Sequence, residues 1–160
     1  MTPQKISSET KFPHLLFKNV LVPIDGSQNS KRALQIAVAI AKKYDAQLFV
    51  VHVVSTPMLL APSPSPYIII GKYLDFEDEE ARKIVNEGVL LAKRHGVKVT
   101  GHVIKHGPSV VEAITGFAVK RRVDLIVTGT RGLGGFKKLL LGSVASGMVS
   151  HAHCKVLVVR

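Results

Sequence analysis

The sequence has little of what extracellular and membrane-spanning proteins contain. Its 160 residues hold a single cysteine, Cys154, which excludes an internal disulfide and is typical of a reducing compartment. No apolar run approaches the roughly 20 residues of a membrane-spanning helix. The N-terminus also lacks the apolar core of a secretory signal. We therefore expect a soluble, cytoplasmic protein with no membrane partner.

Acidic residues are scarce in the second half of the chain. Residues 89–160 carry twelve Lys and Arg against two acids, Glu112 and Asp124, whereas residues 1–88 carry ten bases and nine acids. A positive half attracts anions such as nucleotide phosphates, nucleic acids or acidic partners. The chain has no tryptophan and 6% aromatic residues, and no recognition helix is evident. We therefore rank nucleic acid last among these partners and do not expect it.

Apolar patterning divides the chain into alternating strands and helices after a polar tail over residues 1–17. We expect a single domain over residues 18–160, with strands at 19–25, 48–54, 97–104, 123–129 and 155–160. Helices are expected from Ser27 to Tyr44, from Asp75 to Gly96, from Pro108 and from about Ser143. The Pro-rich residues 55–74 are expected to form a long loop.

This alternation predicts a three-layer α/β fold with a doubly wound, five-stranded parallel sheet, because strands that are apolar on both faces need helices on both sides. Right-handed crossovers leave few topologies, and the strand order 3-2-1-4-5 fits five such strands. Ligands bind where the winding reverses, beyond the carboxyl ends of the strands. In this order that place is formed by Asp25-Gly26 and by residues 129–132.

The glycine-rich stretch from Gly129 to Ser143 is the strongest sign of a binding site. Its glycines let a ligand lie against the main chain, and Gly142-Ser143 begins a helix whose free N–H groups suit a phosphate. Arg131, Lys137 and Lys138 could supply charge. The stretch matches neither a P-loop nor a strand-GxGxxG-helix unit, so taken alone it also fits an ordinary loop.

The spacing G-x2-G-x9-G-S, formed by Gly129, Gly132, Gly142 and Ser143, resembles the nucleotide-binding motif of the ATP-binding universal stress proteins. The resemblance runs from Asn19 to the end of the chain and includes NVLVPIDGS, GPSVVEAI, DLIVTGTRGLGG, LLLGSVAS and CKVLVVR. It implies an adenine nucleotide alpha hydrolase-like fold. It also implies ATP, or AMP, as ligand, with Mg²⁺ or Mn²⁺ bound through the phosphates.

The resemblance also implies roles for matching residues. Asp25 contacts the ribose, the backbone at Val53 holds the adenine edge, and the loop glycines approach the phosphates with Arg131. The full expected set is Pro23, Asp25, Val53, Gly129, Thr130, Arg131, Gly132, Gly142, Ser143, Val144 and Ala145. Ala145 stands where the family often has Ser or Thr, and the lost donor weakens binding by about 1 kcal/mol. We expect no catalytic residue and no metal ligand from the protein.

Three other features favour structural roles. His52 lies in a buried strand and is interpreted as a core histidine, and Cys154 as an inert thiol. The run from His151 to Cys154 lacks a common zinc spacing.

The expected function is a nucleotide-dependent stress-response or regulatory factor. A slow ATP-hydrolysing enzyme and, last, a basic nucleic-acid-binding protein are the alternatives; turnover requires a positioned water, and only Asp25 falls near the loop. The apolar strand at residues 155–160 is expected at a sheet edge, where it would pair with a second copy in a homodimer, as in family members. The alternative is that the N-terminal tail covers this edge.

Overall fold

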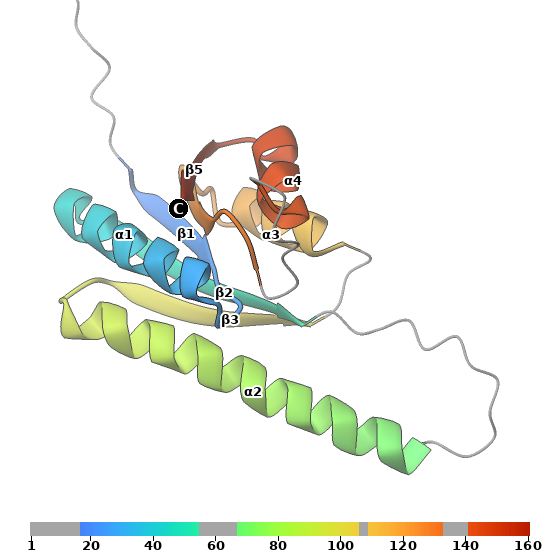
Figure 1. The fold of residues 1–160 in the computed structure, drawn as a ribbon. Coiled ribbons are helices and arrows are strands. Elements are labelled where there is room, and N and C mark those ends of the chain that lie inside the picture. Colours follow the sequence, from blue (N-terminus) through green and yellow to red (C-terminus); the bar gives the residue numbers. More distant parts are fainter. Residues whose placement is uncertain (1–16, 55–66, 106–108, 133–140) are drawn as a thin grey trace, which may run out of the picture.

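The computed structural model describes residues 17–54, 67–105, 109–132 and 141–160, and the backbone alone over residues 67–77. Strands and helices alternate along the chain, as predicted (Figure 1). The strands are β1 (Asn19–Pro23), β2 (Gln47–Val54), β3 (Val99–Lys105), β4 (Leu125–Gly129) and β5 (Lys155–Val159). The helices are α1 (Gln28–Tyr44), α2 (Tyr67–Arg94), α3 (Val110–Lys120) and α4 (Ser143–His151). No helix in these ranges is long and apolar enough to cross a membrane.

The five strands form one parallel sheet in the order β3-β2-β1-β4-β5, which confirms the predicted order. β1 lies in the middle, where its Leu21 stands opposite Phe49 of β2 and Ile126 of β4. β3 and β5 form the edges of this sheet. The segments that follow β1 and β4 therefore leave the sheet side by side.

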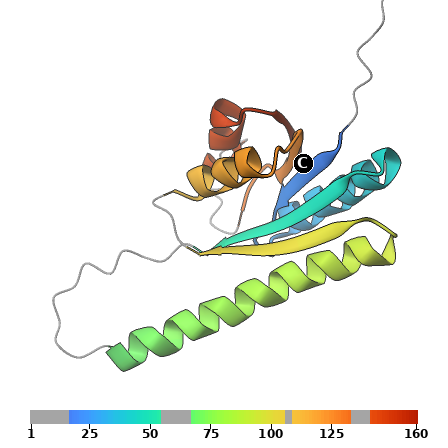
Figure 2. The same ribbon diagram turned by 180° about the vertical axis from the view of Figure 1, so that it is seen from behind.

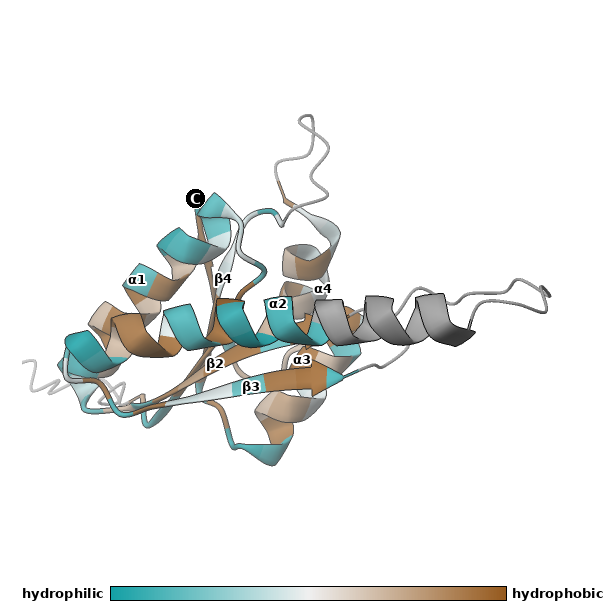
Figure 3. Ribbon diagram, turned by 90° about the horizontal axis from the view of Figure 1, so that it is seen from below, coloured by the Kyte–Doolittle hydropathy of each residue, from teal (hydrophilic) through white to brown (hydrophobic). Residues whose placement is uncertain are grey.

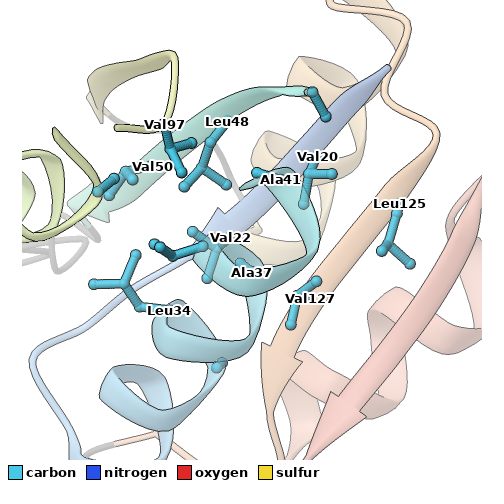
Figure 4. Close-up of a cluster of buried hydrophobic side chains, with 14 of the residues drawn as sticks. Val20, Val22, Leu34, Ala37, Ala41, Leu48, Val50, Val97, Leu125 and Val127 are labelled. Carbon is cyan, nitrogen blue, oxygen red and sulfur yellow. The ribbon is translucent and has the colours of Figure 1, made fainter. Parts of the chain in front are cut away.

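Helices cover both faces of the sheet, α1 and α2 on one and α3 and α4 on the other (Figures 1 and 2). Successive residues of β1 point to opposite faces. Val20 and Val22 pack against Ala37 of α1 (Figure 4), whereas Leu21 packs against Ile114 of α3. All five side chains are almost completely buried. Burial on both faces explains why the strands are nearly continuous apolar runs.

The start of α2 corrects the predicted loop over residues 55–74. The helix begins at Tyr67, well before the expected start at Asp75. The four prolines that argued against regular structure end at Pro66, so the chain beyond it can make helical backbone hydrogen bonds. The rest of the predicted loop, residues 55–66, lies outside the described residues.

α3 begins two residues after Pro108, which was expected at or near its first position. Its N-cap is Ser109, whose hydroxyl accepts the Glu112 N–H at 3.4 Å, and Val110 is its first residue. The Ser-x-x-Glu spacing of Ser109 and Glu112 is a capping-box signal that the sequence contains. Pro108, the expected start, lies outside the described residues.

His102 of β3 lies in an aromatic cluster between the sheet and α3. Its ring centroid is 4.9 Å from that of Phe117, and the Arg121 guanidinium lies 5.5 Å from the Phe117 centroid. Burial and, second, the charge of Arg121 lower the pKa of His102 below 6.5. The unfolded chain therefore takes up a proton at a higher pH than the folded one. His102 should thus lower the free energy of unfolding as the pH falls below about 6.5.

Urea unfolding of the wild type and of His102→Gln at about pH 7.5 and pH 5.5 measures this effect. The wild type should lose more stability between the two pH values than the variant, because glutamine does not titrate. An equal loss in both proteins would contradict the prediction.

Candidate functional site

The carboxyl end of β1 is held by hydrogen bonds to β2. The Ile24 N–H donates to the Val51 carbonyl oxygen at 2.8 Å, and Nδ1 of His52 lies 2.7 Å from the Ile24 carbonyl oxygen. A carbonyl oxygen only accepts, so His52 carries its proton on Nδ1 and donates it there. His52 thus positions the turn that follows β1, in agreement with its interpretation as a core histidine.

Asp25 lies in that turn, immediately before α1. Gly26 adopts a φ of +82°, a left-handed conformation that glycine takes without strain. The Ser27 N–H donates to Oδ1 of Asp25 at 3.0 Å, and the Asp25 N–H donates to Oγ of Ser30 at 3.4 Å. Ser27 also caps α1 by accepting the Ser30 N–H. The carboxylate is therefore oriented at a helix N-terminus, where the helix dipole favours a negative charge.

In the loop after β4, Gly132 packs against the side chain of Asp25. A Cβ atom built on Gly132 would lie 2.5 Å from Oδ2 of Asp25, which is closer than real Cβ atoms come to other atoms. Gly129 has a different reason to be glycine. A Cβ atom there would lie 2.8 Å from the backbone carbonyl carbon of Asn29, so Gly129 is required where β4 packs against the start of α1.

The start of α4 is joined to the same loop. The Gly142 N–H donates to the Thr130 carbonyl oxygen at 2.7 Å, and the Thr130 N–H donates to the Val159 carbonyl oxygen of β5 at 3.0 Å. Gly142 is the N-cap of α4, which has no side-chain cap and no acidic residue in its first turn. The first N–H groups of α4 have no intrahelical acceptor and suit an anion.

Arg131 supplies a further unsatisfied donor. Among the described residues, its Nε is a buried side-chain atom without a hydrogen-bond partner. Leaving a buried donor unpaired costs about 1–3 kcal/mol. The backbone of Arg131 adjoins the start of α4, since a Cβ atom on Gly142 would lie 3.4 Å from the Arg131 Cα. A phosphate-bearing ligand that accepts from Nε would recover this cost.

Most of the predicted residues gather at the carboxyl ends of β1 and β4. The gathered segments are Pro23–Asp25, Gly129–Gly132 and Gly142–Ala145. Val53 lies near the end of the neighbouring strand β2 and is half-buried. The Ala145 side chain is 3% exposed, so the backbone N–H is the part of this residue that can meet a ligand. Lys137 and Lys138 lie outside the described residues.

Two residues that support the site were missed by the sequence analysis. Asn29 packs against Gly129, and Ser30 bonds the backbone of Asp25. Their position in the first helical turn after Asp25 was the available signal. In the described part of the chain, no three His, Cys, Asp or Glu side chains are grouped so as to hold a metal ion.

A separate groove of about 220 Å³ opens between α1 and α2, next to Gly26. Apolar side chains, including Leu34, Ile84 and Leu91, make up much of its lining. Neither Asp25 nor any residue of 129–132 or 142–145 lines it. We therefore locate the candidate nucleotide site at the carboxyl ends of β1 and β4 and not in this groove.

Comparison with known proteins identifies the family of this chain. The universal stress protein family model matches residues 16–160. A universal stress protein of Methanocaldococcus jannaschii is 38% identical over 146 residues, which cover 91% of this chain and 83% of that protein. The structure of universal stress protein UspA from Lactobacillus plantarum matches with a TM-score of 0.79 at 26% identity, over 91% of this chain and 99% of that one. A universal stress protein in complex with cAMP matches with a TM-score of 0.63 at 26% identity, over 91% and 98% of the two chains. This chain belongs to the universal stress protein family.

Proposed function

We propose that this protein binds ATP, or AMP in its place, and acts as a nucleotide-dependent regulatory factor in a stress response. The observation that carries the proposal is the close approach of Gly132 to the Asp25 carboxylate, with the backbone of Arg131 beside Gly142 at the open N-terminus of α4. The segments that follow β1 and β4 would thus contribute a ribose-binding carboxylate and phosphate-binding donors. The relative that was solved with cAMP supports an adenine nucleotide as the ligand class.

Each group would contact one part of the nucleotide. Asp25 would accept hydrogen bonds from the ribose hydroxyls, and the backbone at Val53 would bond the adenine edge. Gly132 would let the phosphates approach the main chain, while Arg131 and the N–H groups that follow Gly142 would bind their oxygens. Mg²⁺ or Mn²⁺ would bind to the phosphate oxygens of the nucleotide and neutralise part of their charge.

Mass spectrometry of ligand released from the denatured, purified protein tests the proposal directly. Bound ATP or AMP supports it, and calorimetric titration of the emptied protein then gives the affinity. A protein that carries no nucleotide and shows no heat of binding with ATP or AMP would contradict it. Release of orthophosphate from bound ATP would favour the alternative of a slow hydrolase.

Asp25→Ala should weaken ATP binding by about 1.5–3 kcal/mol, which corresponds to roughly 10- to 150-fold, because a charged hydrogen-bond acceptor is removed. The loss should be much smaller for 2′,3′-dideoxy-ATP, which lacks the ribose hydroxyls. Calorimetric titration of both ligands measures the difference. Asp45→Ala is the matched control, since Asp45 is an exposed carboxylate that pairs with Lys98. Equal losses for the two ligands would assign Asp25 a structural role.

We further propose a homodimer formed through β5. β5 is an edge of the described sheet, and its Leu157 is 38% exposed. Val149 on α4, the helix next to β5 in the sequence, is 54% exposed. An apolar edge strand favours pairing with a second copy, and a two-fold dimer is the commonest closed arrangement.

A further inference from the structure

The fold gathers positive charge at the end of the sheet opposite the nucleotide site. Each helix of a parallel βαβ unit runs back along the sheet, so α1, α2 and α3 end where the next strands begin (Figures 1 and 2). We call the exposed cations at this end the basic edge. Its residues are Lys18, Lys42, Lys43, Lys93, Arg94, Lys98, Lys120, Arg121, Arg122 and Lys155.

Few carboxylates offset these ten cations. At this end of the described structure the acids are Asp45, whose carboxylate pairs with Lys98 at 3.0 Å, and Asp124. Oδ2 of Asp124 accepts the backbone N–H groups of Lys18 and Asn19, each at 2.8 Å. Ten positive and two negative groups leave an excess of eight positive charges. In Figure 3 the last turn of α2 has the hydrophilic colour.

Helix dipoles account for only part of this excess. The C-terminus of a helix is equivalent to about half a negative charge, so three helix ends offset about 1.5 charges. One cation in the last turn of each of α1, α2 and α3 would be enough to offset the partial negative charge of that helix end. The remaining charges repel one another across the basic edge, and a bound polyanion would relieve this repulsion.

We infer that the basic edge binds the phosphate backbone of double-stranded nucleic acid without reading its sequence. Cations spread over three helix ends and three strand starts suit an extended row of phosphates. Single strands would need exposed aromatic side chains to stack on. The described aromatic rings near this end instead pack on one another: Phe17 lies edge to face on Tyr44 at 5.2 Å, and Phe49, beside the Arg121 guanidinium, lies edge to face on Phe117 at 5.8 Å.

Nucleic acid thus becomes a proposed partner, contrary to the expectation from the sequence. That expectation rested on the scarcity of aromatic residues and on the lack of a recognition helix. Both features concern the stacking or reading of bases, and contact with phosphates needs neither. Because the basic edge and the candidate nucleotide site lie at opposite ends of the strands, the two ligands should bind at the same time.

The test uses the full chain and a 30-base-pair DNA duplex of arbitrary sequence, with binding followed by fluorescence anisotropy over a range of salt concentrations. The triple variant Lys42→Gln, Lys93→Gln, Lys120→Gln removes three charges from the basic edge. The control Arg32→Gln, Arg82→Gln, Lys83→Gln removes three exposed charges of α1 and α2 that lie outside the basic edge. Circular dichroism melting confirms that both variants fold.

The basic-edge variant should bind the duplex at least tenfold more weakly at about 0.1 M salt. The slope of log K against log salt should become shallower by about 3, since each lysine that contacts a phosphate contributes about 0.9. The control should stay within about twofold of the wild type, and ATP should leave duplex binding unchanged. Equal weakening in both variants, displacement of the duplex by ATP, or tighter binding to phosphatidylserine vesicles than to the duplex would overturn the inference.

Discussion

Gly132→Ala is expected to lower the affinity for ATP by at least tenfold while the domain stays folded. The new Cβ atom would come within 2.5 Å of Oδ2 of Asp25, so the carboxylate must turn away from the position in which it would meet the ribose. The fold should tolerate the change, because Gly132 is exposed and does not require a left-handed backbone. Calorimetric titration with ATP and a thermal melt of the same sample measure the two effects.

A matched control and a double mutant make this prediction specific. Gly116→Ala places a Cβ atom in open space on α3 and should leave the affinity unchanged. In an Asp25→Ala background, Gly132→Ala should cost little more, because its effect passes through the carboxylate. Full additivity of the two changes, or an unaltered affinity in folded Gly132→Ala, would contradict the assigned role of Gly132.

Val158→Pro is expected to convert the proposed dimer into a monomer. The carbonyl of Val159 accepts the Thr130 N–H and therefore points toward β4. Backbone groups alternate along a strand, so the Val158 N–H points to the open edge of the sheet. Proline at position 158 removes this outward donor without removing a bond to β4. Sedimentation equilibrium of the wild type and of the variant measures the change in mass.

Val158→Thr provides the control for dimerisation, since threonine keeps both the N–H group and a β-branched side chain. It should remain dimeric. A monomeric wild type would indicate that something other than a second copy covers β5, such as the N-terminal tail. A Val158→Pro protein that stays fully dimeric would place the interface elsewhere.

Much of this fold could be predicted from local patterns. Apolar runs such as Leu48 to Val54 identified the buried strands, and Ser27 marked the start of α1, because strand burial and helix capping depend on neighbouring residues. The predictions were wrong where a local signal was applied to residues beyond those that carry it. The four prolines before Tyr67 led to the prediction of a loop as far as residue 74, although a helix begins at Tyr67. The helix after Pro108 has Ser109 as its N-cap, which was not predicted.

The residue types at the candidate site were also evident from the sequence, whereas the reasons for them were not. The spacing of the glycines at 129, 132 and 142 indicated a loop that follows a strand and precedes a helix. It could not show that Gly129 makes room for Asn29 while Gly132 makes room for the Asp25 carboxylate. The pairing of β1 with β4 brings these distant parts of the chain together.

The charge of the molecule likewise depends partly on the sequence alone and partly on the tertiary structure. The sequence by itself determined that residues 89–160 are strongly basic, and composition says nothing about where such charges lie. Only the tertiary structure decided that seven of these twelve cations join Lys18 and the end of α1 in the basic edge. The physical reason is that consecutive parallel strands require each connecting helix to run back to the amino ends of the strands. Short-range patterns thus specified the elements, and the long-range packing of the sheet specified which of their ends meet.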